Sequence, residues 1–333
     1  MKRKFEQPIG LQMNPEELLI KFLYEYLDND SDKSQEEWLK EQSNDGEVSA
    51  FFYKLNNENL NKAFQRFNEL DSMNYFLELI TKMGYFHIVV PAINFLEKVD
   101  YEELHEIITD SILAAAYYNH FEIVTYLLKY VAANYPNTHE GLVNETFQVL
   151  AREGKIKAVH FFMHSNLPID PSSAIYEALD QFDIVKFIAL NTKVSLNLPE
   201  IQNAVQESNN SNVVQFLVEK FCADPSANNN QCIRNAYTNK NFPLVLYLAS
   251  LPRVMETLDA KHQEAIATLK HNFKNSFDHE LRKYRTNYCM FFSHFSKLYV
   301  QNTDVQTIIR YLGLIQIQND FALNDQALNF VLN

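Results

Sequence analysis

A recurring phrase constrains the fold of this chain more than any other feature. In LAAAYYNHFEIVTYLLKY (113–130), small residues lead to a short polar break, and an Ile-Val-x-x-Leu-Leu run follows. Related phrases place the second apolar residue of that run at positions 89, 124, 159, 185, 214 and 245, at intervals of 35, 35, 26, 29 and 31 residues. Recurrence at this period is typical of stacked helix pairs, so we expect about six pairs between residues 71 and 253.

Each unit is expected to contain a short helix, a tight break and a second helix with an apolar stripe. Small side chains let two helices approach closely, and this role falls to Ala115, Ala204 and Ala236. A residue with positive φ would close the break, where the chain has Gly84, Asn119 and Gly154. An ordinary amphipathic bundle is the alternative, and six in-phase phrases disfavour it.

One phrase, DSILAAAYYNHFEIVTYLL, resembles a degenerate ankyrin repeat with the consensus T-P-L-H-x-A-A-x-x-G-H-x-x-V-V-x-x-L-L. Asp110 stands at the Thr position, Ile112 at Leu, Ala115 and Ala116 at the paired Ala, Asn119 at Gly and His120 at His. The stretch ADPSANNNQCIRNAY (223–237) resembles the finger-plus-helix phrase of ankyrin arrays in amoebae, giant viruses and intracellular bacteria. The resemblance covers roughly residues 71 to 253 and implies an all-α helical-repeat solenoid.

The chain also departs from the ankyrin pattern. No unit carries T-P-L-H, and the shortest intervals between units are 26 and 29 residues. We therefore expect β-hairpin fingers to be trimmed or lost in several units, whereas the helix stack is kept.

The resemblance also implies which residues edge a concave partner-binding groove. They lie between the paired Ala and the turn Gly of each unit: Lys82, Met83, Tyr117, Tyr118, Arg152, Glu153, Thr238 and Asn239. Tyr117 and Tyr118 are the strongest candidates, because tyrosine offers a large contact area at low entropic cost. Packing between repeats is the alternative role for both.

Helical regions are expected on both sides of the array. Residues 1–13 are expected to be flexible, and residues 14–70 to form an N-terminal helical cap. Asn14, Pro15, Glu16 and Glu17 are typical of a helix start, and 28–35 reads as a polar loop. Residues 254–333 are expected to be helical, either as a C-terminal cap or as a separate domain.

Composition limits the classes of function. Six glycines and no Gly-rich phosphate loop leave no indication of a cofactor, and a net charge of −13 argues against nucleic acid as a partner. No apolar run predicts a membrane span. The cysteines, Cys222, Cys232 and Cys289, have no paired spacing, which favours buried thiols in a reducing compartment such as the cytoplasm.

Two groups of residues offer candidate chemistry, but neither predicts a catalytic or metal site. His160 and His164 lie one turn apart and could bind a metal, but the sequence offers no third ligand. Cys289 could pair with His294 or His279 as a nucleophile, although the aromatic residues around it are typical of an inert buried thiol.

The most basic stretch, 261–285, could contact an acidic protein, an anionic membrane or RNA. Its main cations are Lys270, Lys274, Arg282, Lys283 and Arg285. Interleaved Glu264, Asp278 and Glu280 favour an ordinary solvated helix face instead.

The sequence thus predicts a non-enzymatic module that binds a protein partner. The resemblance adds the expectation of a bacterial effector acting in a host cytosol. Two alternatives stay open: an enzyme with its site in 254–333 and the repeats as a substrate-binding arm, and a peripheral membrane adaptor that uses the basic stretch. The sequence leaves the oligomeric state open.

Overall fold

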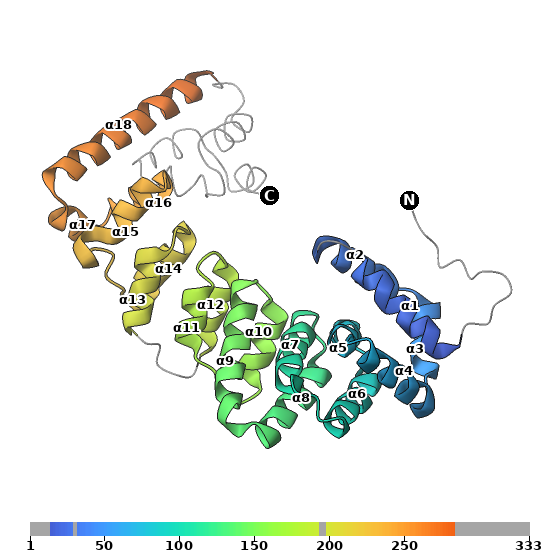
Figure 1. The fold of residues 1–333 in the computed structure, drawn as a ribbon. Coiled ribbons are helices and arrows are strands. Elements are labelled where there is room, and N and C mark those ends of the chain that lie inside the picture. The colour runs from blue at the N-terminus through green and yellow to red at the C-terminus, as the bar shows by residue number, and fades with distance from the viewer. Residues whose placement is uncertain (1–13, 29–31, 193–197, 284–333) are drawn as a thin grey trace. The chain divides into compact units, whose positions relative to one another are not determined.

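Helices account for the whole regular structure of the described part of this chain (Figure 1). The computed structural model describes residues 14–28, 32–192 and 198–283. These residues form eighteen helices and no strand, so the predicted all-α class is confirmed. They belong to two compact units.

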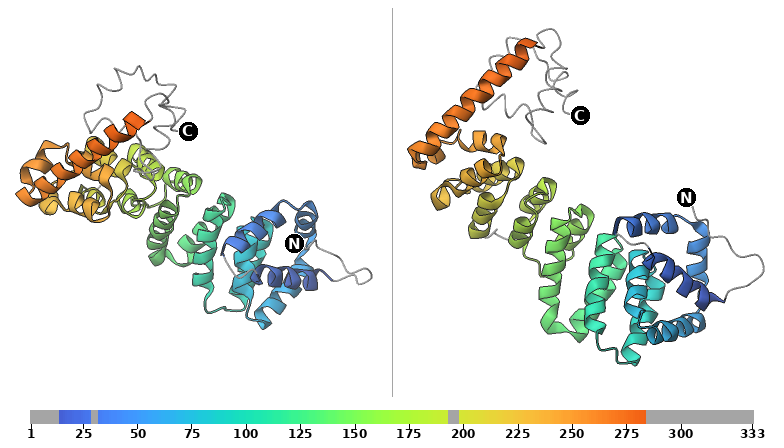
Figure 2. Two further views of the ribbon diagram at one scale, coloured as in Figure 1. Left: turned by 90° about the horizontal axis from the view of Figure 1, so that it is seen from above. Right: turned by 45° about the horizontal axis from the view of Figure 1, so that its top comes forward.

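Unit 1 consists of Met1–Leu150 and Lys155–Ile169. Its helices are α1 (Pro15–Leu27), α2 (Asp32–Ser43), α3 (Gly46–Lys54), α4 (Asn57–Glu69), α5 (Met73–Lys82), α6 (Phe86–Lys98), α7 (Leu104–Tyr117), α8 (Phe121–Asn134), most of α9 (Pro136–Arg152) and α10 (Ile156–His164). In both views of Figure 2, α5 to α8 lie side by side. First helices of successive pairs pack together (α5 with α7), and so do second helices (α6 with α8).

Unit 2 consists of Ala151–Gly154 and Asp170–Asn333. Its helices are α11 (Pro171–Glu177), α12 (Phe182–Asn191), α13 (Leu198–Glu207), α14 (Ser211–Phe221), α15 (Ala227–Thr238), α16 (Phe242–Leu248), α17 (Pro252–Thr257) and α18 (Ala260–Lys283). Here α11, α13 and α15 pack in one series, and α12, α14 and α16 in another. The 24-residue α18 packs against α16.

The start of α1 follows the predicted signal. The Asn14 Oδ1 accepts a hydrogen bond from the Glu17 N–H at 2.8 Å, and the Glu17 carboxylate accepts one from the Asn14 N–H at 3.4 Å. This reciprocal capping box satisfies two N–H groups that the first helical turn leaves without partners. The predicted polar loop over 28–35 was too long, because α2 already begins at Asp32.

The repeated phrase corresponds to a helix pair wherever it occurs. Each marker residue is fully buried on the second helix of its pair: Val89, Val124, Val159, Val185, Val214 and Val245. Ala115 and Ala204 are also fully buried on first helices, and Ala236 is 2% exposed. Burying these side chains stabilises each pair by removing apolar surface from water.

Left-handed residues close several of the breaks within pairs. The predicted positive φ is confirmed at Gly84 (81°), Asn119 (66°) and Gly154 (69°), and Lys240 (57°) takes the same conformation. At Asn119 the turn is closed by two backbone bonds, from His120 N to Ala115 O at 2.8 Å and from Asn119 N to Ala116 O at 3.1 Å. This is the Schellman arrangement, which satisfies carbonyls at the end of a helix.

Aromatic side chains link the second helices of neighbouring pairs. In unit 1, the Phe86 ring lies 5.6 Å from the Tyr126 ring, and Phe121 stacks on Phe161 at 4.6 Å. These contacts add ring–ring attraction to the apolar burial along this row.

Candidate partner-binding surface

Unit 1 gathers a cluster of tyrosines and lysines from helices far apart in the sequence. We name it the tyrosine–lysine cluster, and its members are Tyr26, Glu78, Lys82, Tyr117, Tyr118 and Lys155. Tyr26 comes from α1, Glu78 and Lys82 from α5, Tyr117 and Tyr118 from the end of α7, and Lys155 from the residue before α10.

Lys82 connects the inner part of the cluster. Its Nζ lies 2.5 Å from a Glu78 carboxylate oxygen and donates to the Tyr26 hydroxyl at 2.8 Å. That hydroxyl donates to the same carboxylate at 3.3 Å. The Lys82 side chain is only 18% exposed, so the three polar groups satisfy one another where water reaches them poorly.

The electrostatics follow from this geometry. Burial alone would lower the pKa of Lys82, but its bonds to Glu78 and Tyr26 outweigh burial and raise that pKa. Burial also raises the pKa of Tyr118 to about 12, with a smaller opposing effect from the nearby Lys82 charge. Lys82 therefore stays charged and Tyr118 stays neutral at physiological pH.

The outer part of the cluster presents aromatic surface. The rings of Tyr117 and Tyr118 lie 5.4 Å apart, and both side chains are partly exposed. The Lys155 ammonium sits 3.3 Å from the centre of the Tyr117 ring, which is a cation–π contact. The two rings thus form a partly exposed aromatic surface beside two cations.

His120 fixes this surface against the preceding helix pair. Its Nε2 lies 2.8 Å from the Lys82 carbonyl oxygen, and its ring packs over Gly84 so closely that a Cβ there would lie 2.5 Å from ring atoms. Burial lowers the pKa of His120, and the hydrogen bond to Lys82 opposes that shift. The end of α5 and the start of α8 are therefore held together by a neutral imidazole.

The predicted groove residues have different surroundings. Lys82, Tyr117 and Tyr118 come together in the cluster. Met83 is only 8% exposed, which leaves little of its side chain for a partner to contact.

The other predicted residues lie exposed in unit 2: Arg152, Glu153, Thr238 and Asn239. Arg152 pairs there with Glu177 at 3.5 Å.

Sequence reasoning missed Tyr26, Glu78 and Lys155. The four-residue spacing of Glu78 and Lys82 is a recognisable signal for a helical ion pair. Tyr26 lies 56 residues before Lys82, and no local pattern indicates that contact.

Unit 2 contains a different polar arrangement, which we name the asparagine turn (Asn228–Asn230). These three consecutive residues have φ of 50°, 55° and 60°, all left-handed. Each such residue costs about 1–2 kcal/mol for an L-amino acid, least for Asn and Gly. A run of three requires compensating contacts.

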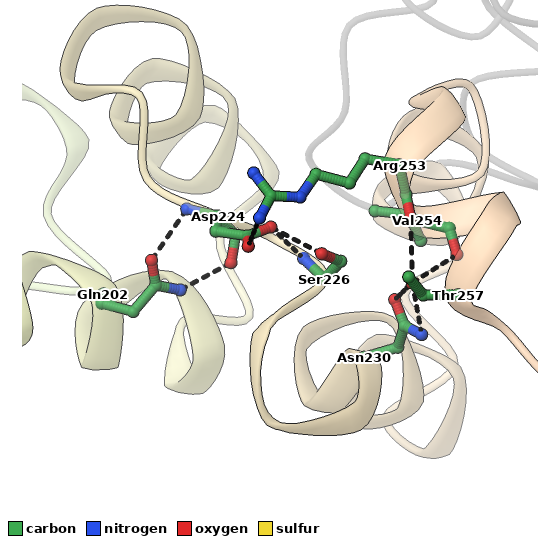
Figure 3. A network of polar contacts seen from close by, with 7 residues as sticks. All are labelled: Gln202, Asp224, Ser226, Asn230, Arg253, Val254 and Thr257. Atoms are coloured by element: carbon green, nitrogen blue, oxygen red, sulfur yellow. Dashed lines mark hydrogen bonds and ion pairs between the residues drawn. The ribbon is translucent and has the colours of Figure 1, made fainter.

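Figure 3 shows polar contacts of Asn230 and of Asp224, which lies four residues before the turn. The Gln202 amide donates to the Asp224 carbonyl at 2.6 Å and accepts from the Asp224 N–H at 2.7 Å. Buried Asn230 exchanges hydrogen bonds with the Thr257 hydroxyl at 3.1 and 3.2 Å. Arg253 pairs with Asp224 at 2.6 Å, so a residue before the turn is joined to one after it.

The structure adds little support for the other candidate sites. The rings of His160 and His164 stack at 4.1 Å, and the described residues contain no group of three or more His, Cys, Asp or Glu placed to hold a metal ion. Cys232 is buried as predicted, but Cys222 is exposed, which corrects that part of the prediction. Cys289 and His294 lie outside the described residues.

The basic stretch lies only partly within the described residues. Lys270 is half-buried on α18, where its ammonium donates to the Ala249 carbonyl at 3.3 Å, and burial lowers its pKa. Lys274, Arg282 and Lys283 belong to α18, and Arg285 lies outside the described residues.

Comparison with protein-family models, with curated proteins and with solved structures gave no match. Among the described helices, none combines the length and apolar character needed to cross a bilayer.

Proposed function

We propose that this chain is a non-enzymatic module that binds a protein partner, and that the tyrosine–lysine cluster is its main contact surface. The observation that carries the proposal is a hydrogen-bonded network next to a partly exposed aromatic surface. The network consists of Lys82, Glu78 and Tyr26, whose polar atoms lie 2.5 to 3.3 Å apart. Tyrosines presented on a preorganised surface are typical of binding hot spots.

The proposal includes a degenerate ankyrin-type array. It is supported by the buried marker residues, the positive φ at Gly84, Asn119 and Gly154, and the series of first and second helices within each unit. Tyr117 and Tyr118 lie where that resemblance puts groove residues. The expectation of a bacterial effector in a host cytosol rests on the sequence resemblance alone.

Affinity capture from a eukaryotic lysate tests the proposal. The wild-type chain is compared with Tyr117→Ala/Tyr118→Ala, and with Tyr237→Ala as the matched control. The control removes an exposed tyrosine near the end of α15 that is not among the predicted groove residues. We expect one partner to be captured by the wild type and the control and lost by the first variant, with unchanged circular dichroism. Capture by all three proteins would refute the assignment of the surface.

A further inference from the structure

Residues 71–150 of unit 1, which include α5 to α8, carry a marked excess of negative charge. Residues 71–150 contain eleven acidic residues but only three lysines and no arginine. The lysines are Lys82, Lys98 and Lys129. Lys82 is the one that belongs to the tyrosine–lysine cluster, and it already pairs with Glu78. A surface of this sign attracts cationic groups and repels nucleic acid and anionic membranes.

Part of this charge lies in an acidic strip formed by the cluster member Glu78 and by Glu106 and Asp110 of α7. Glu106 and Asp110 are four residues apart on α7, so they face the same side of that helix. Neither makes a salt bridge within the described residues. Desolvation by neighbouring groups raises the pKa of Asp110, and the charges of Glu78 and Glu106 raise it further.

Like charges arranged this way on a helix are unfavourable for folding. A cation placed between them would relieve that repulsion. The strip is also continuous with the tyrosines, because Glu78 contacts both Lys82 and Tyr26. Tyrosine rings here already accept ammonium groups, as Lys155 shows at 3.3 Å over Tyr117 and Lys82 at 5.5 Å over Tyr26.

From these contacts we infer that the partner of this surface presents a basic segment, with Lys or Arg side chains that pair with the acidic strip and pack on the tyrosines. From Glu106 to Tyr118, α7 advances about 18 Å. That length accommodates several residues of an extended segment, so two or more cations can contact the surface at once. This inference rests on the proposed function and adds the chemistry of the partner.

A charge-matched peptide experiment tests the inference. The probe is a short fluorescent peptide of alternating Arg and Ser, with a Glu-Ser peptide as the negative control. Its affinity for the full chain is measured by anisotropy at about 0.05 and 0.2 M salt, where screening differs. The test variant is Glu106→Gln/Asp110→Asn.

The matched control is Glu122→Gln/Glu140→Gln, which removes the same charge from exposed positions on α8 and α9. Glu122 also lies in the first turn of its helix, as Glu106 does. We expect the test variant to weaken Arg-Ser binding about fivefold, since exposed ion pairs contribute up to about 1 kcal/mol, and the control to weaken it less than about twofold. Urea unfolding confirms that both variants fold.

Equal weakening by the two variants, or no binding of the Arg-Ser peptide, would overturn the inference. Failure here is distinguishable from failure of the proposed function. If Tyr117→Ala/Tyr118→Ala abolishes partner capture while Glu106→Gln/Asp110→Asn changes neither peptide binding nor capture, the surface is correct and its partner is not basic. If the tyrosine variant still captures the partner, the proposed function itself is wrong.

Discussion

The tyrosine–lysine cluster and the asparagine turn both depend on polar side chains, but these side chains hold different parts of the molecule in place. In the cluster, side chains bond mainly to other side chains: Lys82 to Glu78, and Tyr26 to both. In unit 2, Gln202 bonds instead to the backbone of Asp224.

The two regions therefore differ in which side chains remain available to a partner. In the asparagine turn, the bonds of Asn230 to Thr257 and of Arg234 to the Asn228 carbonyl hold three left-handed residues in an unfavourable conformation. Side-chain bonds in the cluster hold neighbouring side chains and leave Tyr117 and Tyr118 partly exposed. We therefore expect changes in the asparagine turn to affect stability, and changes in the cluster to affect binding.

The largest effect is expected from Asn230→Ala. Alanine at φ 60° costs about 1–2 kcal/mol, and loss of the buried amide removes both of its hydrogen bonds with the Thr257 hydroxyl, which keeps its bond to the Arg253 carbonyl at 2.8 Å. The free energy of unfolding should fall by about 2–4 kcal/mol, measured by urea denaturation.

Asn229→Ala is the matched control, because Asn229 is also left-handed but exposed. It should lose only about 1 kcal/mol. Equal losses at the two positions would show that the bond to Thr257 contributes nothing.

The same variant should expose the thiol of Cys232, two residues after the turn. Burial raises the pKa of Cys232 to about 12, so it reacts only when unit 2 opens locally. In a Cys222→Ser/Cys289→Ser background, Asn230→Ala should accelerate iodoacetamide labelling at least about tenfold. An unchanged rate would mean that the turn does not control opening near Cys232.

A double-mutant cycle on Lys82→Met and Glu78→Gln should give a coupling energy of about 0.5–1 kcal/mol. The pair is partly shielded, with the lysine side chain 18% exposed. Lys62 and Glu58 form the matched control, with the same spacing but 57% and 74% side-chain exposure. Their coupling should be smaller, and an equal value would contradict the role assigned to shielding.

The smallest effect concerns pH and His120. Because burial lowers the pKa of folded His120, the unfolded chain takes up the proton first as pH falls. The contribution of His120 to stability is complete above the ordinary histidine pKa of about 6.5. It is lost as pH falls from there through the lower pKa that His120 has in the folded chain. His120→Gln keeps a donor for the Lys82 carbonyl and cannot titrate.

Urea unfolding is measured above and below that pH range. As pH falls across it, the free energy of unfolding should decrease more for the wild type than for His120→Gln. The raised pKa of Asp110 acts in the opposite direction, and it is present in both proteins. Parallel pH curves for the two proteins would show that His120 does not contribute.

Local signals in the sequence predicted the helices and several of their turns. The marker valines recur at intervals of 26 to 35 residues, which predicts helix pairs, and Gly84 and Asn119 belong to the residue types that adopt positive φ most readily. Lys240 was missed because lysine is uncommon in that conformation.

The candidate site was predicted only in part. Tyr117 and Tyr118 follow from their position before the turn, whereas Tyr26 meets Lys82 across 56 residues. Asn230 and Thr257 meet across 27 residues. Such contacts depend on how helices pack, and local spacing carries no information about them. The burial of Met83 is likewise a result of packing.

Site-specific photocrosslinking shows directly whether Tyr118 lies in the partner-binding surface. A benzophenone analogue of phenylalanine replaces Tyr118 in one protein and Tyr237, a 44% exposed tyrosine on α15, in another. After irradiation in the same lysate, we predict a discrete adduct from position 118 and none from position 237. An adduct from position 237 alone would place the binding surface in unit 2 and contradict the account.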